Sequence, residues 1–271
     1  MPIAALIYDF DQTLTPKAMQ EYGLIESLGV EQDDFWNDCR RFALKHNADG
    51  ILSYMAVTLA HARKKGLKLS RDEFVRHGGA IDFYPGVEEW FSKTREYAAG
   101  IGLELEHYIV SSGLVELIEG SRIAKEFKAV FAASFAYDDD GAPFWPATAV
   151  NYTAKTQYLF RINKGILDVT NDRDLNDFTP EEKRRVPFRN MIYIGDGLTD
   201  VPCMKLVKTN GGQSIAVYDP QKGSAAAQEL QRADRVNFIA PADYREGGRL
   251  ETVVKAIMRK IQAVESMCGC Q

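Results

Sequence analysis

Short apolar segments alternate with helical stretches along most of the chain. Residues 3–8 are almost entirely apolar and end abruptly at Asp9, a pattern typical of a buried parallel strand whose carboxyl end faces a crevice. The alternation of such strands with helices favours an open parallel sheet that is covered by helices on both faces. Further strands are predicted at residues 108–110, 130–136, 191–194, 215–218 and 236–239.

Residues 16–80 interrupt this alternation, because their pattern is helical throughout. Apolar side chains recur at helical spacing from Met19 to Leu28, which predicts one helix, and a second helix is predicted near residues 35–45. These residues therefore form a small all-helical unit.

Several helix starts can be predicted from single residues. Asp49 is placed to cap a third helix of this unit. Ser70 and Glu73 have the spacing of a capping box, which predicts the start of a fourth. Pro85 is suited to the first turn of a helix that runs through Glu96.

The chain is therefore expected to form two domains of the α/β class. The core, residues 1–15 and 81–271, is predicted to be a three-layer, Rossmann-like parallel sheet. Residues 16–80 are predicted to be an all-helical cap, inserted directly after the first strand. A small β-hairpin is expected at residues 133–145, around an Asp-Asp-Gly turn.

The composition is that of an ordinary globular protein of 271 residues, with 45% hydrophobic and 26% charged residues. The net charge of −5 argues against nucleic acid or an anionic membrane as partner, but it leaves room for one small anion. The first residues lack the features of a signal peptide. No segment approaches the ~18–20 apolar residues of a membrane span, so we expect a cytoplasmic protein.

Cysteine usage adds little to this assignment. Four cysteines, Cys39, Cys203, Cys268 and Cys270, are too few and too scattered for a disulfide framework. The terminal Cys-Gly-Cys either binds a soft metal or forms a labile disulfide, or it belongs to a frayed, exposed tail. The sequence leaves the oligomeric state open.

Polar residues gather where predicted strands end. Asp9 and Asp11 directly follow the first strand. Because positions two apart in an extended segment point to the same side, their carboxylates should converge on one pocket. Ser111, Ser112 and Gly113 are predicted to form a turn after a later strand. Hydroxyls and backbone N–H groups in such a turn can bind an anion.

Two further polar pieces complete the set. Lys155 stands at the start of a predicted helix after the hairpin, and Gly195, Asp196 and Asp200 follow another predicted strand. Taken singly, such pieces are ordinary turns or surface charges. Their order along one chain, with three of them directly after apolar strands, favours a shared site.

Together the pieces resemble the four motifs of the haloacid dehalogenase-like phosphatases. Residues 9–13 resemble the first motif, and Ser111 is similar to the hydroxyl of the second. Lys155 resembles the basic residue of the third, with Lys164 as the other candidate, and residues 195–200 resemble the fourth. The long separation of the first two motifs leaves room for the helical cap of the subgroup that includes phosphoserine phosphatase.

The resemblance implies a role for each residue. Asp9 would attack phosphorus to form an aspartyl-phosphate, while Asp11 would protonate the leaving oxygen and later activate water. Two close carboxylates do not readily ionise together, so the pKa of one should be raised. The implied Mg²⁺ ligands are Asp9, the backbone carbonyl of Asp11, and Asp196, with Asp200 as a further ligand or directly behind them. The implied phosphate-binding residues are Thr13, Ser111, Ser112, Gly113 and Lys155.

The resemblance therefore implies a magnesium-dependent phosphomonoester hydrolase that acts on a small soluble metabolite. A phosphotransferase or mutase with the same intermediate is an alternative, and a non-catalytic protein that binds a phosphate ligand is another. The second carboxylate, Asp11, argues for phosphoryl transfer and against dehalogenation. In phosphoserine phosphatases the cap supplies charged groups for the amino acid, but the sequence does not assign that role to Glu21, Arg40 or Arg41.

Overall fold

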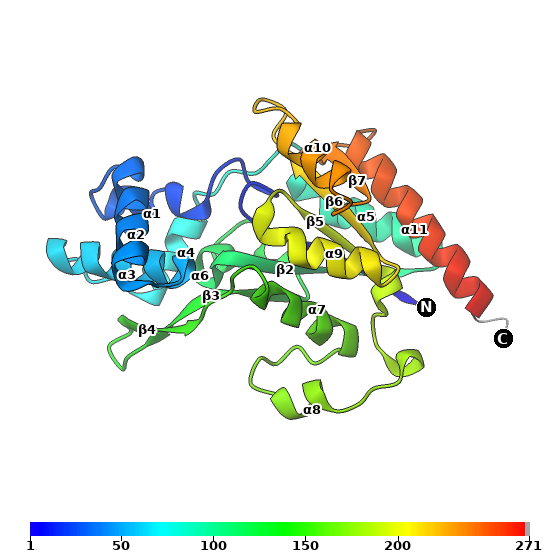
Figure 1. The fold of residues 1–271 in the computed structure, drawn as a ribbon, viewed down its shortest axis with the longest axis horizontal. Helices are drawn as coiled ribbons and strands as arrows, with labels where there is room; N and C mark the ends of the chain where they lie inside the picture. Colours follow the sequence, from blue (N-terminus) through cyan, green and yellow to red (C-terminus); the bar gives the residue numbers. More distant parts are fainter. Residues whose placement is uncertain (269–271) are drawn as a thin grey trace.

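The computed structural model describes residues 1–268 of the chain. A seven-stranded sheet crosses the core in the order β4-β3-β2-β1-β5-β6-β7 (Figure 1). Neighbouring strands pair in parallel, except that β3 and β4 form an antiparallel hairpin. The strands are β1 Ile3–Tyr8, β2 Glu104–Leu114, β3 Ala129–Tyr137, β4 Pro143–Thr148, β5 Met191–Gly195, β6 Gln213–Tyr218 and β7 Phe238–Pro241.

The sheet is the middle of three layers, as its first strand shows. Leu6 and Tyr8 pack into a core with the helices α5 and α11, whereas Ala5 and Ile7 pack into a separate core with α7, α9 and α10. Side chains of a strand point alternately to its two faces, so both faces of β1 are buried. The α/β, Rossmann-like prediction is thereby confirmed. The helices of the core are α5 Val87–Gly100, α6 Val115–Glu119, α7 Ala154–Lys164, α8 Asp172–Asn176, α9 Val201–Thr209, α10 Ala225–Arg232 and α11 Arg249–Cys268. Short 3₁₀ turns are η2 Ala124–Glu126, η3 Glu181–Lys183, η4 Phe188–Asn190 and η5 Leu198–Asp200.

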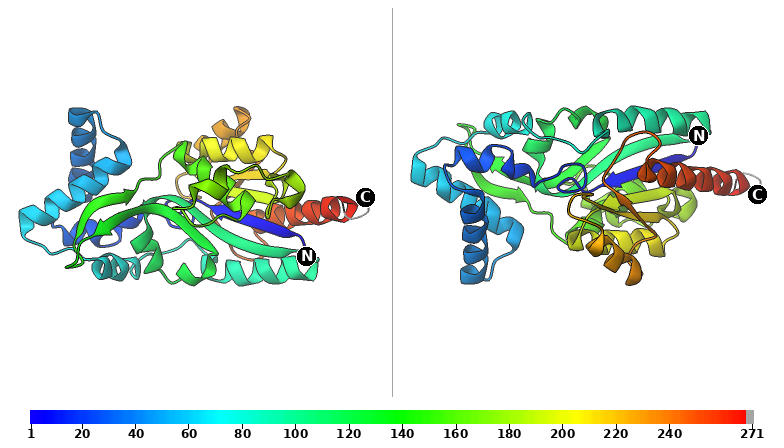
Figure 2. Two further views of the ribbon diagram at one scale, coloured as in Figure 1. Left: turned by 90° about the horizontal axis from the view of Figure 1, so that it is seen from below. Right: turned by 90° about the horizontal axis from the view of Figure 1, so that it is seen from above.

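The inserted helices lie beyond the carboxyl ends of the central strands (Figures 1 and 2). The Asp49 carboxylate accepts the N–H groups of Ile51 and Leu52 at 2.8 and 3.2 Å, and so caps the third predicted helix. The capping box of Ser70 and Glu73 is also present. Both predictions of a helix start are confirmed. The elements of the insertion are η1 Met19–Glu21, α1 Leu24–Ser27, α2 Gln32–His46, α3 Gly50–Lys65 and α4 Arg71–Gly78.

Two helix predictions were wrong, each at a glycine with positive φ. The stretch from Met19 to Leu28 is not one helix, because Gly23 has φ 98° and separates η1 from α1. Pro85 precedes its helix instead of lying in the first turn, because Gly86 has φ 83°. A Cβ on Gly86 would come within 2.5 Å of the Arg245 backbone nitrogen. The helix α5 therefore starts later than predicted and extends past Glu96.

The second polar piece also differs from its prediction. Ser111, Ser112 and Gly113 were predicted to form a turn after a strand, but they lie inside β2, which continues to Leu114. The pairing of β2 with β3 shifts register between Val110 and Leu114. The segment is thus an irregular strand end. The short apolar run at residues 108–110 did not reveal that the strand continues to Leu114.

The hairpin and the last inserted helix pack against each other. The predicted hairpin at residues 133–145 is confirmed by the antiparallel pairing of β3 and β4. The rings of Phe74 in α4 and Phe135 in β3 stack with centroids 5.6 Å apart. A Cβ on Gly78 would lie 2.1 Å from the Leu117 carbonyl oxygen, so this glycine permits the close approach of α4 to α6. The insertion is therefore fastened to the core through α4.

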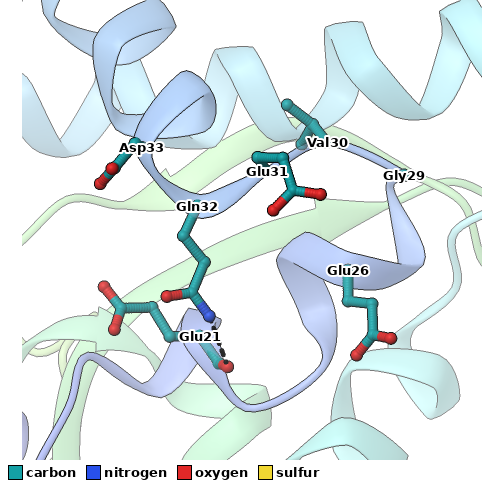
Figure 3. A pocket seen from close by; sticks show the side chains of 7 residues that line it. All are labelled: Glu21, Glu26, Gly29, Val30, Glu31, Gln32 and Asp33. Atoms are coloured by element: carbon teal, nitrogen blue, oxygen red, sulfur yellow. Dashed lines mark hydrogen bonds between the residues drawn. The ribbon is translucent and has the colours of Figure 1, made fainter.

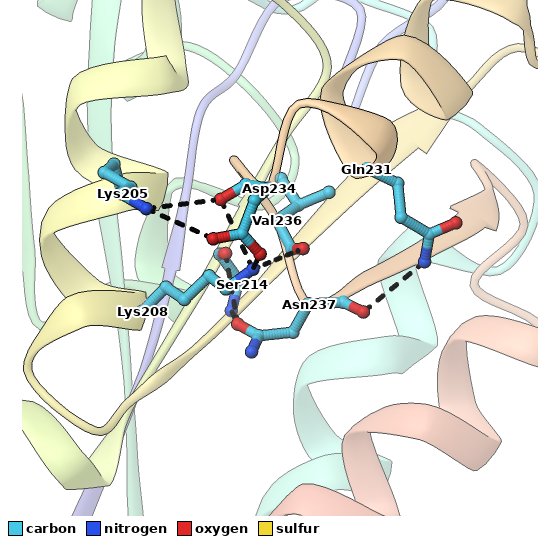
Figure 4. A network of polar contacts seen from close by, with 7 residues as sticks. All are labelled: Lys205, Lys208, Ser214, Gln231, Asp234, Val236 and Asn237. Atoms are coloured by element: carbon cyan, nitrogen blue, oxygen red, sulfur yellow. Dashed lines mark hydrogen bonds and ion pairs between the residues drawn. The ribbon is translucent and has the colours of Figure 1, made fainter.

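A polar network connects α9 with the segment between α10 and β7 (Figure 4). Asp234, which has φ 57°, accepts from Lys208 at 2.6 Å and from Lys205 at 3.4 Å. The Ser214 N–H donates to Asn237 Oδ1 at 2.9 Å. These bonds tie α9 to the turn after α10 and β6 to the residue before β7. None of these residues belongs to the site below.

Among the described residues, no helix is long and apolar enough to cross a membrane. Cys39 and Cys203 are buried free thiols, and Cys268 is exposed at the end of α11. Cys270 lies outside the described residues.

Candidate active site

Asp9 stands where the central strand β1 ends. Its backbone N–H donates to the Ile194 carbonyl at 2.9 Å, so the residue stays tied to β5, and its side chain is almost fully buried. The chain then turns at Gln12, which has φ 57°. The turn directs the partly buried Asp11 towards the insertion, where its Oδ1 accepts the Met19 N–H at 2.8 Å.

Lys155 lies between two carboxylates in the floor of the site. Its fully buried Nζ donates to Asp9 Oδ1 at 2.8 Å and to Asp200 Oδ1 at 2.7 Å. Burial alone would lower the pKa of Lys155, but the charges of Asp200 and Asp9 outweigh it, so the pKa lies above its ordinary value and the ammonium stays charged. Lys164, at the other end of α7, donates to the carbonyls of Leu175 and Asp177 instead.

Asp200 is fully buried and has protein partners on both oxygens. Its Oδ1 accepts from Lys155 and, at 2.7 Å, from the Tyr193 hydroxyl; its Oδ2 accepts the Gly197 N–H at 3.4 Å. A Cβ on Gly195 would lie 2.5 Å from Asp200 Oδ2, so only glycine fits there without a shift. Sequence reasoning missed Tyr193, because inside an apolar strand a tyrosine is indistinguishable from a core residue.

Carboxylates crowd this floor. One oxygen from each of Asp9, Asp196 and Asp200 lies within 4.8 Å of the others. Such hard oxygen donors fit Mg²⁺, whereas the side chain of Asp11 does not belong to this group and faces Met19 instead. The backbone carbonyl of Asp11 is the ligand that the family resemblance implies.

The crowding changes proton affinities. Burial raises the pKa of Asp11 to about 8, with a further contribution from the charge of Asp9. Burial and the same neighbouring charge raise the pKa of Asp196 to about 8. Asp9 rises less, to about 6, because Lys155 counteracts its burial and the charge of Asp200. The predicted rise for one of two close carboxylates is thus present at Asp11.

The strand end with the serines lies beside Asp11. Ser111 is fully buried, and its Oγ accepts the Gly113 N–H at 3.0 Å. A Cβ on Gly113 would meet the Met19 side chain at 2.1 Å and Asp11 Oδ2 at 3.3 Å. Ser112 Oγ and Thr13 Oγ1 are buried without a hydrogen-bond partner. The serine segment therefore approaches Asp11 at Gly113.

The inserted helix α3 contacts two of these elements. The Tyr54 hydroxyl donates to the Ser112 carbonyl at 3.0 Å. The Asp49 carboxylate accepts from Asn151 Nδ2, and the Asn151 carbonyl accepts the Lys155 N–H at 3.0 Å. One helix thus supports both the serine segment and the helix that carries Lys155. Because these contacts join residues far apart in the chain, no local sequence pattern predicts them.

The charged candidates of the insertion are held by contacts within the insertion. Arg40 and Arg41 are exposed on α2, where they pair with Asn37 and Asp38. Glu21 accepts from Trp36 Nε1 at 2.9 Å. It also borders an acidic hollow of about 630 Å³ that contains none of the motif residues (Figure 3). The hollow is lined by Glu21, Glu26, Gly29, Val30, Glu31, Gln32 and Asp33.

Comparison with known proteins shows the family of the chain. The family model of the haloacid dehalogenase-like hydrolases matches residues 6–205, which include all four motifs. The chain belongs to this family. An uncharacterised protein of Borreliella burgdorferi is 30% identical to this haloacid dehalogenase-like hydrolase over 280 aligned positions, which cover 92% of this chain and 94% of the relative.

Solved structures share the fold of this haloacid dehalogenase-like hydrolase at low identity. One is a family hydrolase from Salmonella enterica serovar Typhi, with a TM-score of 0.55 and 16% identity; the alignment covers 82% of this chain and 65% of that one. Another is a phosphoserine phosphatase with an analogue of a phospho-aspartyl intermediate. It has a TM-score of 0.55 and 14% identity, with 94% and 99% of the two chains covered.

Proposed function

We propose that this protein is a magnesium-dependent phosphomonoesterase that hydrolyses a small soluble phosphate ester through a phosphorylated Asp9. The observation that carries the proposal is the contact of Asp9 with the buried ammonium of Lys155, combined with the raised pKa of Asp11 nearby. One carboxylate is thereby kept ionised and the other protonated. These are the states required of a nucleophile and of a general acid.

The proposed reaction has two successive displacement steps at phosphorus. In the first, an Asp9 oxygen forms a bond to phosphorus, the bond from phosphorus to the ester oxygen breaks, and Asp11 gives its proton to that oxygen. In the second, water attacks the phosphorus on Asp9, Asp11 takes a proton from the water, and phosphate leaves with Asp9 regenerated. Asp11 returns to its starting state, so the cycle conserves protons.

Lys155 stabilises the charge that gathers on the phosphoryl oxygens. A pair of unit charges about 4 Å apart interacts by roughly 4 kcal/mol at an effective dielectric constant near 20. If that energy is expressed in the transition state, it corresponds to about three powers of ten in rate. Asp200 holds the Lys155 ammonium in place before substrate arrives, and the Tyr193 hydroxyl holds Asp200.

Phosphate would be held by the serine segment and the metal site. Gly113 of this segment lies beside Asp11, and Ser112 Oγ and Thr13 Oγ1 have no protein partner. Bound at Asp9, Asp196 and the backbone carbonyl of Asp11, Mg²⁺ would supply positive charge to the phosphoryl oxygens, with Asp200 behind these ligands.

The proposal is tested with purified protein and p-nitrophenyl phosphate. Release of inorganic phosphate should require Mg²⁺, stop with a chelator and return when Mg²⁺ is added. Asp9→Asn should abolish it while the protein keeps its cooperative thermal transition. Near-normal turnover by Asp9→Asn would remove Asp9 as the nucleophile. Transfer of phosphate mainly to an added alcohol or sugar, instead of to water, would assign a phosphotransferase.

A further inference from the structure

Buried polar atoms without a partner collect where the insertion meets the core. Nearly all buried polar groups in folded proteins are hydrogen-bonded, so such a collection points to a missing ligand. Gln20 is the most telling case, because its side chain is only 2% exposed and its Oε1 accepts nothing. The seam consists of the unpartnered atoms near Tyr54, which are Gln20 Oε1, Ser112 Oγ and Glu116 Oε2.

Tyr54 connects members of this seam to one another. Its hydroxyl donates to the Ser112 carbonyl at 3.0 Å, and the Gln20 side chain hydrogen-bonds to it. Burial raises the pKa of Tyr54 well above its ordinary value, and the charges of Asp11 and Glu116 raise it further. Gln20 and Ser112 therefore lie on the side of the site where Asp11 stands.

That side receives the leaving group. If Asp11 protonates the ester oxygen, as the proposed function requires, the departing alcohol lies next to it. The Asp11 carboxyl meets the insertion at the Met19 N–H, one residue before Gln20. The departing alcohol would therefore lie next to the seam that contains the unpartnered atoms.

Charge along this path is negative. Burial has the largest effect on the pKa of Asp11. The charges of Asp9 and Glu21 raise this pKa further, and the charge of Lys155 lowers it. Lys155 is already held by two carboxylates. Lys17 is exposed, with its Nζ 5.9 Å from the centre of the Tyr22 ring. A carboxylate on the leaving alcohol would thus be buried near like charges without a cation of its own, which is strongly unfavourable.

Two of these unpartnered atoms are hydrogen-bond acceptors, whereas the Ser112 hydroxyl can both donate and accept. Gln20 Oε1 can only accept a hydrogen bond, and Glu116 Oε2 accepts whenever that carboxyl is ionised. A hydroxyl or amine on the substrate would satisfy them. Resting on the proposed function, we propose that the substrate is the phosphate ester of an alcohol that carries further hydrogen-bond donors and neither a carboxylate nor a second phosphate, and that Gln20 binds this alcohol.

The proposal predicts an order of substrates for the wild-type protein with Mg²⁺. Glycerol 2-phosphate and 2-phosphoglycerate differ by one hydroxymethyl or carboxylate group, and phosphoethanolamine and phosphoserine differ by a carboxylate alone. We expect kcat/KM to be about tenfold or more higher for the carboxylate-free member of each pair, because specificity appears in that ratio. Equal values, or a preference for the carboxylated members, would overturn the proposal.

Substitution of Gln20 tests the residue itself. Gln20→Lys places an ammonium where an acceptor stood, so the preference for glycerol 2-phosphate over 2-phosphoglycerate should fall about tenfold or reverse. Lys17→Ala, which removes an exposed cation nearby, should leave that preference unchanged. A preference that is insensitive to Gln20→Lys, or one that changes with Lys17→Ala, would contradict the assignment.

The same assay separates this proposal from the proposed function. Hydrolysis of p-nitrophenyl phosphate together with a preference for carboxylated esters would overturn only the substrate class. Failure to hydrolyse p-nitrophenyl phosphate and every ester of both pairs would overturn the phosphatase itself. Because the wild-type comparison needs no variant, misfolding of Gln20→Lys would leave it intact.

Discussion

Lys155 and Gln20 are both buried polar side chains in one site, yet their surroundings differ. Lys155 has two carboxylate partners within 2.8 Å, and one of these, Asp200, is itself held by Tyr193. Gln20 is 2% exposed and leaves its Oε1 without a partner. The floor lysine is therefore fully held before substrate binds, whereas we infer that the substrate completes the seam under the insertion.

This difference separates reaction from recognition. A preorganised floor lowers the barrier because its charges need no rearrangement during the reaction. Unpartnered acceptors in the seam discriminate between leaving groups, because a poor match leaves them unsatisfied. Changes in the floor should therefore reduce turnover of every ester, while changes in the seam should alter the order of esters.

The largest effect is expected from the floor lysine. Lys155→Met should lower kcat for p-nitrophenyl phosphate about 10³-fold, because it removes one unit charge from the phosphoryl oxygens. Lys164→Met is the matched control on the same helix and should change kcat less than about threefold, because that lysine bonds only the carbonyls of Leu175 and Asp177 at the end of α8. Steady-state kinetics and thermal unfolding of both variants check this, and equal losses would contradict the role of Lys155.

Asp11 lies between floor and seam, so the loss of activity on its substitution should depend on the leaving group. Asp11→Asn retains an acceptor for the Met19 N–H but has no proton to give. Hydrolysis of an alkyl phosphate should fall about 10²–10⁴-fold. p-Nitrophenolate leaves without protonation, so this variant should release it in a rapid burst before slow turnover. Parallel losses without a burst would show that Asp11 is not the acid.

The smallest effect concerns stability. The pKa of Asp11 is raised by burial to about 8 in the folded protein, so between its unfolded value near 4 and about 8 the folded state holds a proton that the unfolded state releases. This contribution to stability is complete at low pH and is lost as pH rises through that window. In a chelator, the urea midpoint of the wild type should therefore fall more from pH 5 to pH 8 than that of Asp11→Asn. A larger fall for the variant would contradict the raised pKa.

Local sequence signals predicted most of the floor. Strand ends placed Asp9 and Asp196, and Lys155 was placed at the start of its helix, because apolar runs and helix starts are local features. The cap residues Asp49 and Ser70 were predicted for the same reason.

The missed residues are those whose role depends on distant partners. Tyr54 contacts the Ser112 carbonyl 58 positions away, and Tyr193 lies in an apolar strand that hides its hydroxyl. Gln20 has no local signal, because its character comes from burial without a partner. The extent of β2 and the helix start after Gly86 were missed because a register shift and a positive φ are set by tertiary contacts.

Chemical trapping of the intermediate tests the central claim most directly. Hydroxylamine converts an acyl phosphate into a hydroxamate, which peptide mass mapping locates. Protein quenched during turnover of p-nitrophenyl phosphate should carry a hydroxamate on Asp9 only, and only when Mg²⁺ and substrate are both present. Phosphate release without this modification, or with the modification on another residue, would contradict the account.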